Sequence, residues 1–464
     1  MTADLAHAQN VPTEESVREW LQSELGEVVR MDRQARWRPC WYVDVVRDGK
    51  TLPLYVRGPR VDTDPQFTLN HEMTLHRLLE ENGIPVPHVH GSCDEPNFYV
   101  MDRVDGVFEF TDSTDAQRHA VVDQYLQALA RMHSLDVQQF SDAGITRATA
   151  PELSWQPGMA AFERSYRSSK QRPDPLMEWG LAWCHRNPPD TGGREAPVVW
   201  DSGQFLHRDG QMLAMIDFEV GHIGDPMIDL AGWRMRGTIM NYGDFEDLYA
   251  RYGEYRGEPV DLEAIRWHHF AFTLTNQLTF HAALAAPPLG SGYMTNLQWC
   301  TETNVMVVEA YADNFGIDLE QVEVPSPEVG PNAPAFGHLV ESLRHFPATD
   351  GISSTVGMSG ASNVSTYEAR MAFRLARHLQ RFNEIGRKVV EADLDDLEPL
   401  LGHRPATWQE GEEALEKFVI DDNGVHDNEL LHLFNRRTRR AHMLLGPEGS
   451  AMAQHHPCQP FPPR

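Results

Sequence analysis

The sequence predicts an α+β fold with a small antiparallel-sheet lobe, a larger, mostly helical lobe and a helical C-terminal module. Three observations predict it: a strand–turn–strand pattern around Asp48-Gly49, helical periodicity from about residue 115, and a Pro/Gly-rich stretch over 323–337. The chain has 464 residues, which suggests about three units of ordinary domain size.

The first lobe is predicted over residues 12–106. Thr13 can cap a helix whose apolar residues keep helical spacing: Val17, Trp20, Leu21, Leu25 and Val28. Residues 41–47 and 52–57 then predict a hairpin, because β-branched and aromatic residues flank the Asp-Gly turn signal. A helix over about 68–81 and a strand over 97–104 complete this lobe.

The second lobe is predicted over 107–322. Its pattern is mostly helical, apart from an extended–turn–extended segment around Arg208-Asp209-Gly210. A linker is expected over 323–365, and helices over 366–386, 393–419 and 427–445 would form a module at 366–450. The Pro-rich tail, 451–464, is expected to be disordered.

The net negative charge of the chain limits the classes of binding partner that we expect. Asp and Glu outnumber Lys and Arg by 68 to 40, a net charge of −28, so phosphate backbones and anionic membrane surfaces are repelled. We therefore expect no nucleic-acid or membrane partner. The five scattered cysteines and the absence of a signal-peptide pattern indicate a cytoplasmic protein, and a homo-oligomer remains an open alternative.

The most informative segment for chemistry spans residues 198–231. A hairpin returns its second strand to the start of the first, so Asp201 and Asp217 should meet at one open edge. One carboxylate free to handle a hydroxyl proton and one to hold a divalent cation are what phosphoryl transfer requires. Asp225 is predicted to be an ordinary helix cap before Pro226.

This segment also resembles a known family. MIDFEVGHIGDPMIDLA at 215–231 is similar to the metal-binding segment of the aminoglycoside phosphotransferase and choline kinase-like family, and in particular to its hydroxyacyl-CoA kinase-like branch. Four further blocks agree in order: YVRGPR at 55–60, NHEMTLHRLLEENGIPVPHVHG at 70–91, FYVMDRVDG at 98–106 and LARMHSLDV at 129–137. The resemblance covers roughly residues 12–320 and implies a protein-kinase-like two-lobed fold.

The resemblance implies ATP and Mg²⁺ as cofactors and assigns roles residue by residue. Asp201 would handle the substrate hydroxyl, and Asp217 would hold Mg²⁺. Arg57 would bind phosphate with Glu72 as its acidic partner, and an arginine suits that role because it clamps phosphate bidentately. The segment from Phe98 to Val104, including Tyr99 and Met101, would line the adenine. Asp229 would anchor the catalytic loop.

Three departures from the family pattern stand in the same site. Trp200 precedes Asp201 where a glycine is usual, and Leu206 stands where an asparagine metal ligand is expected; Gln204 could replace that ligand, with His207 as a weaker candidate. The phosphate turn lacks glycine and reads Arg36-Trp37-Arg38-Pro39. Arg36 and Arg38 could neutralise phosphate charge, or form an ordinary solvated turn.

The C-terminal module carries no catalytic constellation of its own. It weakly resembles the small helical companion protein of some hydroxyacyl-CoA kinases, which would favour an acyl-CoA-type substrate. Its arginine cluster could meet the phosphates of coenzyme A, or could simply lie in the later turns of a helix: Arg436, Arg437, Arg439 and Arg440.

The sequence therefore predicts an ATP- and Mg²⁺-dependent phosphotransferase acting on a hydroxyl of a small organic molecule, with a hydroxyacyl-CoA as one candidate. The first alternative is a pseudokinase that keeps the fold and acts through binding. The second is a metal-dependent hydrolase built on two aspartates and two histidines: Asp201, His207, Asp217 and His222.

Overall fold

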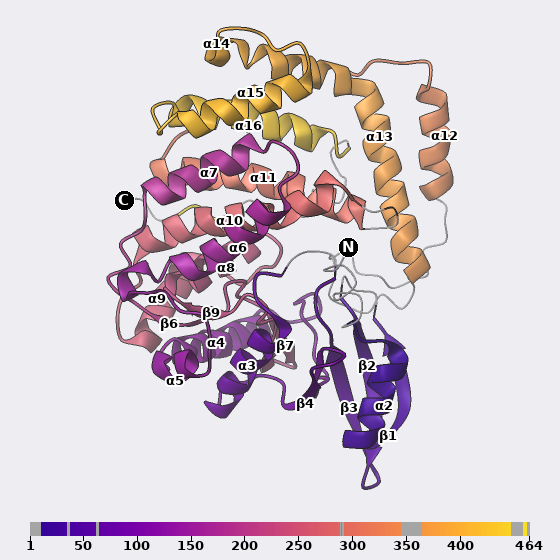
Figure 1. Ribbon diagram of the computed structural model, residues 1–464, viewed down its shortest axis with the longest axis vertical. Helices are drawn as coiled ribbons and strands as arrows, with labels where there is room; N and C mark the ends of the chain where they lie inside the picture. Colours follow the sequence, from indigo (N-terminus) through magenta and orange to yellow (C-terminus); the bar gives the residue numbers. More distant parts are fainter. Residues whose placement is uncertain are drawn as a thin grey trace.

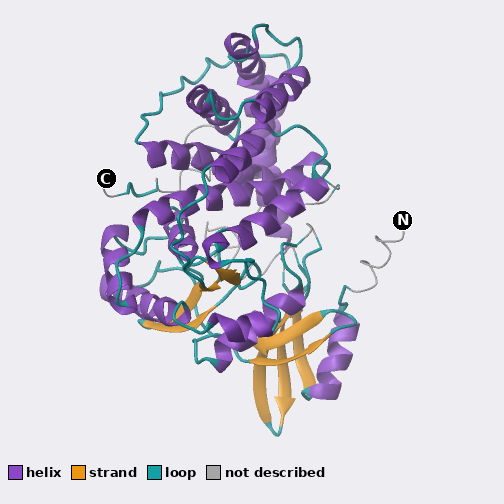
Figure 2. Cartoon of the chain, turned by 60° about the vertical axis from the view of Figure 1, so that its left-hand side comes forward, coloured by secondary structure: helices purple, strands orange, loops and turns teal. Residues whose placement is uncertain are grey.

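The predicted fold class is confirmed by the computed structural model, which describes residues 11–34, 38–61, 65–287, 289, 292–344, 364–446 and 458–461. A five-stranded antiparallel sheet forms one end of the molecule, and helices make up most of the remainder (Figures 1 and 2). No helix among these residues is long and apolar enough to cross a membrane.

The sheet of the first lobe has the strand order β1-β2-β3-β5-β4. The predicted hairpin is confirmed: β2 (Cys40–Arg47) pairs with β3 (Lys50–Arg57) across Asp48-Gly49. The other strands are β1 (Glu27–Arg33), β4 (Val89–Cys93) and β5 (Phe98–Asp102). The first helix, α2 (Glu14–Glu24), is shorter than predicted, because Gly26 has a positive φ and Val28 belongs to β1.

Alternation along β5 divides the lobe into two apolar layers. Phe98 and Val100 face α2 and join the core that includes Val17 and Leu21. Tyr99 and Met101 face the opposite side, where they pack with Leu69 at the start of α3 (Leu69–Glu81). Because side chains alternate along a strand, β5 therefore presents Tyr99 and Met101 to the helix that carries Glu72.

The second lobe is built from helices around two short sheets. Its helices are α4 (Asp115–Met132), α5 (Val137–Asp142), η1 (Pro151–Leu153), α6 (Gln156–Ser169), α7 (Pro175–Arg186), α8 (Met227–Arg236), α9 (Phe245–Arg256), α10 (Leu262–Ala285) and α11 (Tyr293–Phe315). Strands β6 (Ala196–Val198) and β9 (His222–Gly224) pair beside the hairpin β7 (Phe205–Arg208) and β8 (Gln211–Met215). The predicted hairpin at Arg208-Asp209-Gly210 is thus confirmed.

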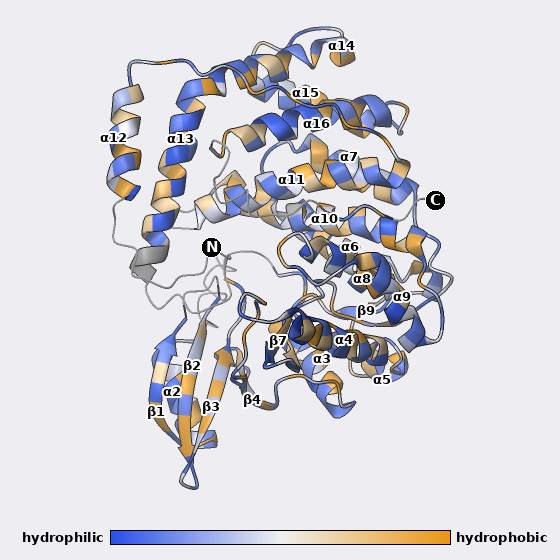
Figure 3. Ribbon diagram, turned by 180° about the vertical axis from the view of Figure 1, so that it is seen from behind, coloured by the Kyte–Doolittle hydropathy of each residue, from blue (hydrophilic) through white to orange (hydrophobic). Residues whose placement is uncertain are grey.

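The C-terminal region differs from the prediction in its helix boundaries. The segment predicted as a linker contains α12 (Ala333–Arg344), which packs beside the long α13 (Val364–Asp395); the rest of that segment, 345–363, lies outside the described residues. Both helices mix polar and apolar residues along their length (Figure 3). The predicted helix 393–419 is divided, because α14 (Glu398–Leu401) ends at Gly402 with a positive φ, and Thr407 caps α15 (Trp408–Asp421).

The last helices share one apolar core with the second lobe. Leu415 of α15 and Phe434 of α16 (Asp427–Met443) belong to the same buried cluster as Trp179 of α7 and Phe270 of α10. The Trp179 indole also donates to Asp427 at 2.9 Å. Helices α15 and α16 are thus continuous with the second lobe through this core.

The arginine cluster of α16 is engaged in ion pairs. Arg436 contacts Glu320 at 3.0 Å and Asp396 at 3.0 Å, and Arg440 contacts Asp393 at 2.8 Å. Arg437 pairs with Glu412, and Arg439 pairs with Glu309. These contacts support the interpretation of the cluster as helix cations with neighbouring carboxylates.

The described part of the tail is packed, which differs from the predicted disorder over 451–464. Phe461 is 7% exposed and its ring lies between two guanidinium groups, 3.7 Å from that of Arg234 and 4.4 Å from that of Arg266. The side-chain oxygen of Gln459 accepts from Phe245 N at 2.9 Å. Composition predicted disorder, but one aromatic side chain and two buried cations suffice to hold this segment.

We expect Phe461→Ala to lower the free energy of unfolding by about 2 kcal/mol, because it removes a buried ring and two cation–π contacts. Urea unfolding measures the change. Pro460→Ala is the matched control, since Pro460 is exposed in the same segment and should leave stability unchanged. Equal stability of the two variants would show that the tail contributes nothing to the fold.

Candidate active site

The β7–β8 hairpin brings its two flanking loops to one edge. Phe205 lies opposite Met215, and beyond that pair Ile216 N donates to the Gln204 carbonyl oxygen at 3.1 Å. Asp201 precedes the first strand of the hairpin and Asp217 follows the second. Burial raises the pKa of Asp201, and the negative charge of Asp217 acts in the same direction.

Asp229, in the first turn of α8, anchors the loop that carries Asp201. The buried Asp229 carboxylate accepts from Val199 N at 3.0 Å and from Trp200 N at 2.7 Å. His133 Nε2 lies 3.0 Å from Oδ2 of the same carboxylate, the oxygen that accepts the 3.0 Å bond from Val199 N. Three donors on one buried carboxylate fix the backbone immediately before Asp201.

The backbone is left-handed at Asp217 and at Trp200, the residue that precedes Asp201. Trp200 has φ 68° and Asp217 has φ 71°, and neither is a glycine. This conformation costs a non-glycine residue roughly 1–2 kcal/mol, so the surrounding contacts must impose it. At Trp200 the contacts are the bond to Asp229 and the packing of its ring against Phe162.

Asp201 is held by two donors. Arg236, at the end of α8, donates to Oδ1 at 2.5 Å, and the Gln204 side-chain amide donates to Oδ2 at 3.0 Å. Burial raises the pKa of Asp201 above its ordinary value, although the Arg236 charge acts in the opposite direction. A raised carboxylate pKa in an oriented side chain suits proton acceptance from a hydroxyl.

Arg57 joins the two lobes at the end of β3. Its Nε lies 2.7 Å from Glu72 on α3, and its Nη2 donates to Asp217 at 2.6 Å. Tyr99 donates its hydroxyl to the same Glu72 oxygen at 3.0 Å. Burial would raise the pKa of Asp217, but the positive charges of Arg57 and Arg38 outweigh it and hold that pKa below its ordinary value.

Arg38 is a second buried cation beside Glu72. It is 4% exposed and lies 3.2 Å from the Glu72 carboxylate, and it also pairs with Glu219. Arg36 lies outside the described residues. The position of Arg38 differs from a solvated turn, because the ion pairs draw its side chain between the lobes.

Glu219 and Arg236 were not predicted as site residues. Glu219 follows Asp217 by two residues, but Asp217 is left-handed and Glu219 lies in a turn, so strand periodicity gave no signal for it. Arg236 lies 35 residues from its partner Asp201, so only the packing of α8 brings the two together.

Among the residues predicted to contact the nucleotide, Tyr99 and Met101 are both buried, 1% and 7% exposed. The Tyr99 hydroxyl is directed at Glu72, which makes this side chain a support for the ion pair. Met101 lies in the layer between β5 and α3.

Residues 42–268 match the sequence profile described as the phosphotransferase enzyme family, and this range contains the described candidate residues except Arg38. This segment is similar to that family. The human acyl-CoA dehydrogenase family member 11 is 25% identical over 237 residues, covering 46% of this chain and 29% of the relative. The mouse family member 10 is 25% identical over 181 residues, covering 35% of this chain and 16% of the relative. The chain thus spans less than a third of the length of either relative.

Solved structures with similar architecture include two kinases. A thermostable mutant of aminoglycoside phosphotransferase APH(4)-Ia is 16% identical with a TM-score of 0.46, covering 64% of this chain and 99% of its own. The Plasmodium vivax ethanolamine kinase is 11% identical with a TM-score of 0.46, covering 63% of this chain and 89% of its own.

In the phosphotransferase segment, two oxygen-bearing side chains are suited to a magnesium ion. Mg²⁺ prefers oxygen ligands and keeps several waters, so one or two protein ligands together with phosphate oxygens can hold it. Asp217 offers a carboxylate. Gln204 offers an amide oxygen, since its side-chain nitrogen is the atom that donates to the Asp201 carbonyl oxygen and to Asp201 Oδ2. These donors fit the ion.

The arrangement expected for a metal-dependent hydrolase is not found. Among the described residues, no group of three or more His, Cys, Asp or Glu side chains could hold a metal ion. His207 contacts the Glu109 carbonyl oxygen and stacks on Phe110, and His222 contacts the Val220 carbonyl oxygen. In the described residues, both rings are thus engaged in packing and backbone contacts, and the structure does not bring Asp201, His207, Asp217 and His222 together as one metal site.

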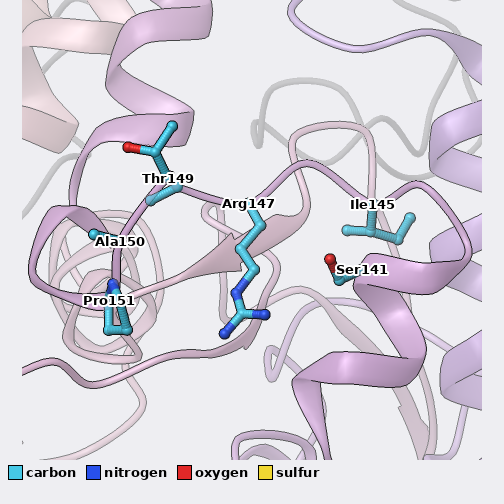
Figure 4. Close-up of a pocket in the computed structure, with 7 residues that line it drawn as sticks. Ser141, Ile145, Arg147, Thr149, Ala150 and Pro151 are labelled. Atoms are coloured by element: carbon cyan, nitrogen blue, oxygen red, sulfur yellow. The ribbon is translucent and has the colours of Figure 1, made fainter.

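A pocket of about 520 Å³ lies elsewhere in the phosphotransferase segment, between α5 and η1 (Figure 4). It is lined by residues from 141 to 151, including Arg147, whose Nε donates to Glu195 at 2.9 Å. None of the candidate site residues lines this pocket. Its principal cation already has a carboxylate partner, so we assign it no role in the reaction.

Proposed function

We propose that this chain is an ATP- and Mg²⁺-dependent phosphotransferase that acts on a hydroxyl of a small organic molecule. The observation that carries the proposal is that Asp201 and Asp217 flank the same end of the β7–β8 hairpin, with Asp217 in contact with the Arg57–Glu72 ion pair. Phosphoryl transfer needs little covalent chemistry from a protein, and these groups supply the required positioning and charge.

Each side chain has a distinct role in this proposal. Asp201, oriented by Arg236 and Gln204, accepts the proton of the acceptor hydroxyl. Arg57 and Arg38 bind the phosphate oxygens, and Glu72 orients both arginines. Asp217 and Gln204 hold the metal ion; bound Mg²⁺ would neutralise charge that develops on the phosphates.

The nucleotide base is proposed to lie against the segment from Phe98 to Val104. Met101 contributes an apolar side chain there, and Tyr99 acts through Glu72. This assignment predicts that substitution of Met101 changes affinity for adenosine more than affinity for inorganic phosphates.

For the acceptor, we propose to test hydroxyacyl-CoA molecules first. Two relatives of the phosphotransferase segment carry the name acyl-CoA dehydrogenase family member, which directs attention to acyl-CoA chemistry. The arginine cluster of α16 does not support this choice, since its members are paired with carboxylates.

A pseudokinase is the alternative that a specific observation favours. Arg57 and Asp217 are 2.6 Å apart, so a phosphate-binding group and a metal-binding group neutralise each other. Trp200 and Leu206 also stand at positions where the resembling family carries other residues. A chain that binds nucleotide without transferring phosphate would act through that binding.

Isothermal titration of ATP with and without Mg²⁺ tests the proposal on wild type and Asp217→Asn. We expect Mg²⁺-dependent binding that weakens at least roughly tenfold in the variant, because a metal ligand loses its charge. Asp209→Asn is the matched control, since it removes one charge from the turn of the same hairpin.

The three outcomes separate the candidates. Mg²⁺-dependent binding followed by transfer to an acceptor supports the phosphotransferase. Binding without transfer to any acceptor of a hydroxyacyl-CoA and amino-alcohol panel supports the pseudokinase. Absence of ATP binding under every condition overturns both.

A further inference from the structure

Glu219 is the meeting point of three arginines. Arg60 Nη1 lies 3.3 Å from Oε1, Arg57 Nη2 lies 3.6 Å from Oε2, and Arg38 pairs directly with Oε2. The arginines belong to the sheet lobe, at the entry to β2 and the end of β3, whereas Glu219 follows Asp217 in the helical lobe. A single carboxylate therefore accepts contacts from three cations across the two lobes.

These arginines are more buried than the carboxylate that they share. The side chains of Arg38, Arg57 and Arg60 are 4%, 13% and 17% exposed, and that of Glu219 is 26% exposed. In the described part of the chain, Arg38 Nε is buried without a hydrogen-bond partner. A buried guanidinium requires anions around it, so this group of arginines has remaining capacity for an anionic ligand.

The local charge balance depends on Glu219. Arg38 and Arg57 face Glu219 together with two further carboxylates, Glu72 and Asp217. Removal of the Glu219 charge would therefore make the site more positive, inside a chain whose net charge is −28. A more positive site attracts a polyanion, and the planar guanidinium groups are suited to phosphate oxygens.

We propose that the Arg38–Arg57–Arg60 cluster is the binding site for the phosphate chain of the nucleotide and that Glu219 occupies it as an internal anion. This inference rests on the proposed function, and it adds Arg60 and a competitor to the phosphate site. Phosphate oxygens displace the Glu219 carboxylate from the arginines when the nucleotide binds. Affinity for the phosphate chain is therefore lower than the cluster alone would provide.

Titration with inorganic tripolyphosphate in the absence of metal tests the proposal on wild type and Glu219→Gln. The glutamine keeps the size of the side chain and removes its charge, so tripolyphosphate should bind about tenfold more tightly. Glu81→Gln is the matched control, because it removes one charge from the exposed end of α3 and should leave the affinity unchanged.

A second variant, Arg60→Gln, tests the proposal even if Glu219→Gln does not fold. Arg60→Gln should weaken tripolyphosphate binding at least about fivefold in the wild-type background. Unchanged or weaker tripolyphosphate binding by a folded Glu219→Gln, as judged by its thermal unfolding, would overturn the proposal, as would unchanged binding by Arg60→Gln. If Glu219→Gln binds tripolyphosphate more weakly than wild type only when Mg²⁺ is added, Glu219 is a metal ligand. That result would also overturn the proposal.

The probe separates this inference from the proposed function. Tripolyphosphate carries no adenine and no acceptor is needed, so the competition by Glu219 is measured even if ATP is not the natural ligand. If the protein binds ATP, and Glu219→Gln changes the affinity for neither ATP nor tripolyphosphate, the proposed function stands. Only the role of Glu219 as an internal anion is then rejected.

Discussion

Asp201→Asn is expected to reduce the rate of phosphoryl transfer by roughly 10²–10⁴-fold, because the variant lacks the group that accepts the hydroxyl proton. Its affinity for ATP should stay within about twofold of wild type, since the Asp201 carboxylate is held by Arg236 and Gln204, which lie outside the group of phosphate-site arginines. Transfer from labelled ATP to the acceptor panel measures the first quantity, and calorimetry measures the second.

The pH dependence provides an independent readout of the same residue. Burial raises the pKa of Asp201, and Asp201 accepts a proton only when it is ionised. As the pH is lowered, the wild-type transfer rate should therefore begin to fall at a higher pH than it would if the base had the ordinary aspartate pKa of about 3.9. A transfer rate unchanged in Asp201→Asn would exclude Asp201 as the base, and the Asp209→Asn variant controls for loss of one charge nearby.

Asp229→Asn is expected to lower the free energy of unfolding by roughly 3–5 kcal/mol, because it disrupts a buried charged network. The carboxylate accepts from Val199 N and Trp200 N and lies against His133, and its side chain is fully buried. An amide keeps the volume but has only one oxygen to accept these donors. Urea unfolding measures the loss.

The control for Asp229→Asn lies in the same segment of chain. Asp209 has φ 50°, a conformation that asparagine tolerates, so Asp209→Asn should change the stability by less than about 0.5 kcal/mol. A loss below about 1 kcal/mol for Asp229→Asn would show that the catalytic loop is held by other contacts.

Much of the architecture was predictable because it depends on local patterns. The β2–β3 hairpin follows from Asp48-Gly49 between β-branched runs, and the β7–β8 hairpin follows from Asp209-Gly210. Those turns also set the register that brings Asp201 and Asp217 to one edge. The helix that carries Glu72 follows from its spacing and its Thr68 cap.

Other features depended on contacts between residues far apart in the sequence. Composition predicted a disordered tail, whereas Phe461 packs on Arg234, which is more than 200 residues away. The Pro/Gly-rich stretch over 323–337 predicted a boundary before a helical C-terminal module, and α15 and α16 of that module share the apolar core around Trp179. Periodicity reports which face of a helix is apolar but not which surface covers it.

The sequence alone therefore determined the fold class, the two hairpins and the types of charged groups available to the site, because these follow from turn residues and spacing. Only the tertiary structure decided how the charges are paired. It joined Arg236 to Asp201, Arg57 to Asp217 and three arginines to Glu219. Ion pairs form where packing brings opposite charges within about 4 Å, and no local pattern encodes that proximity across two lobes.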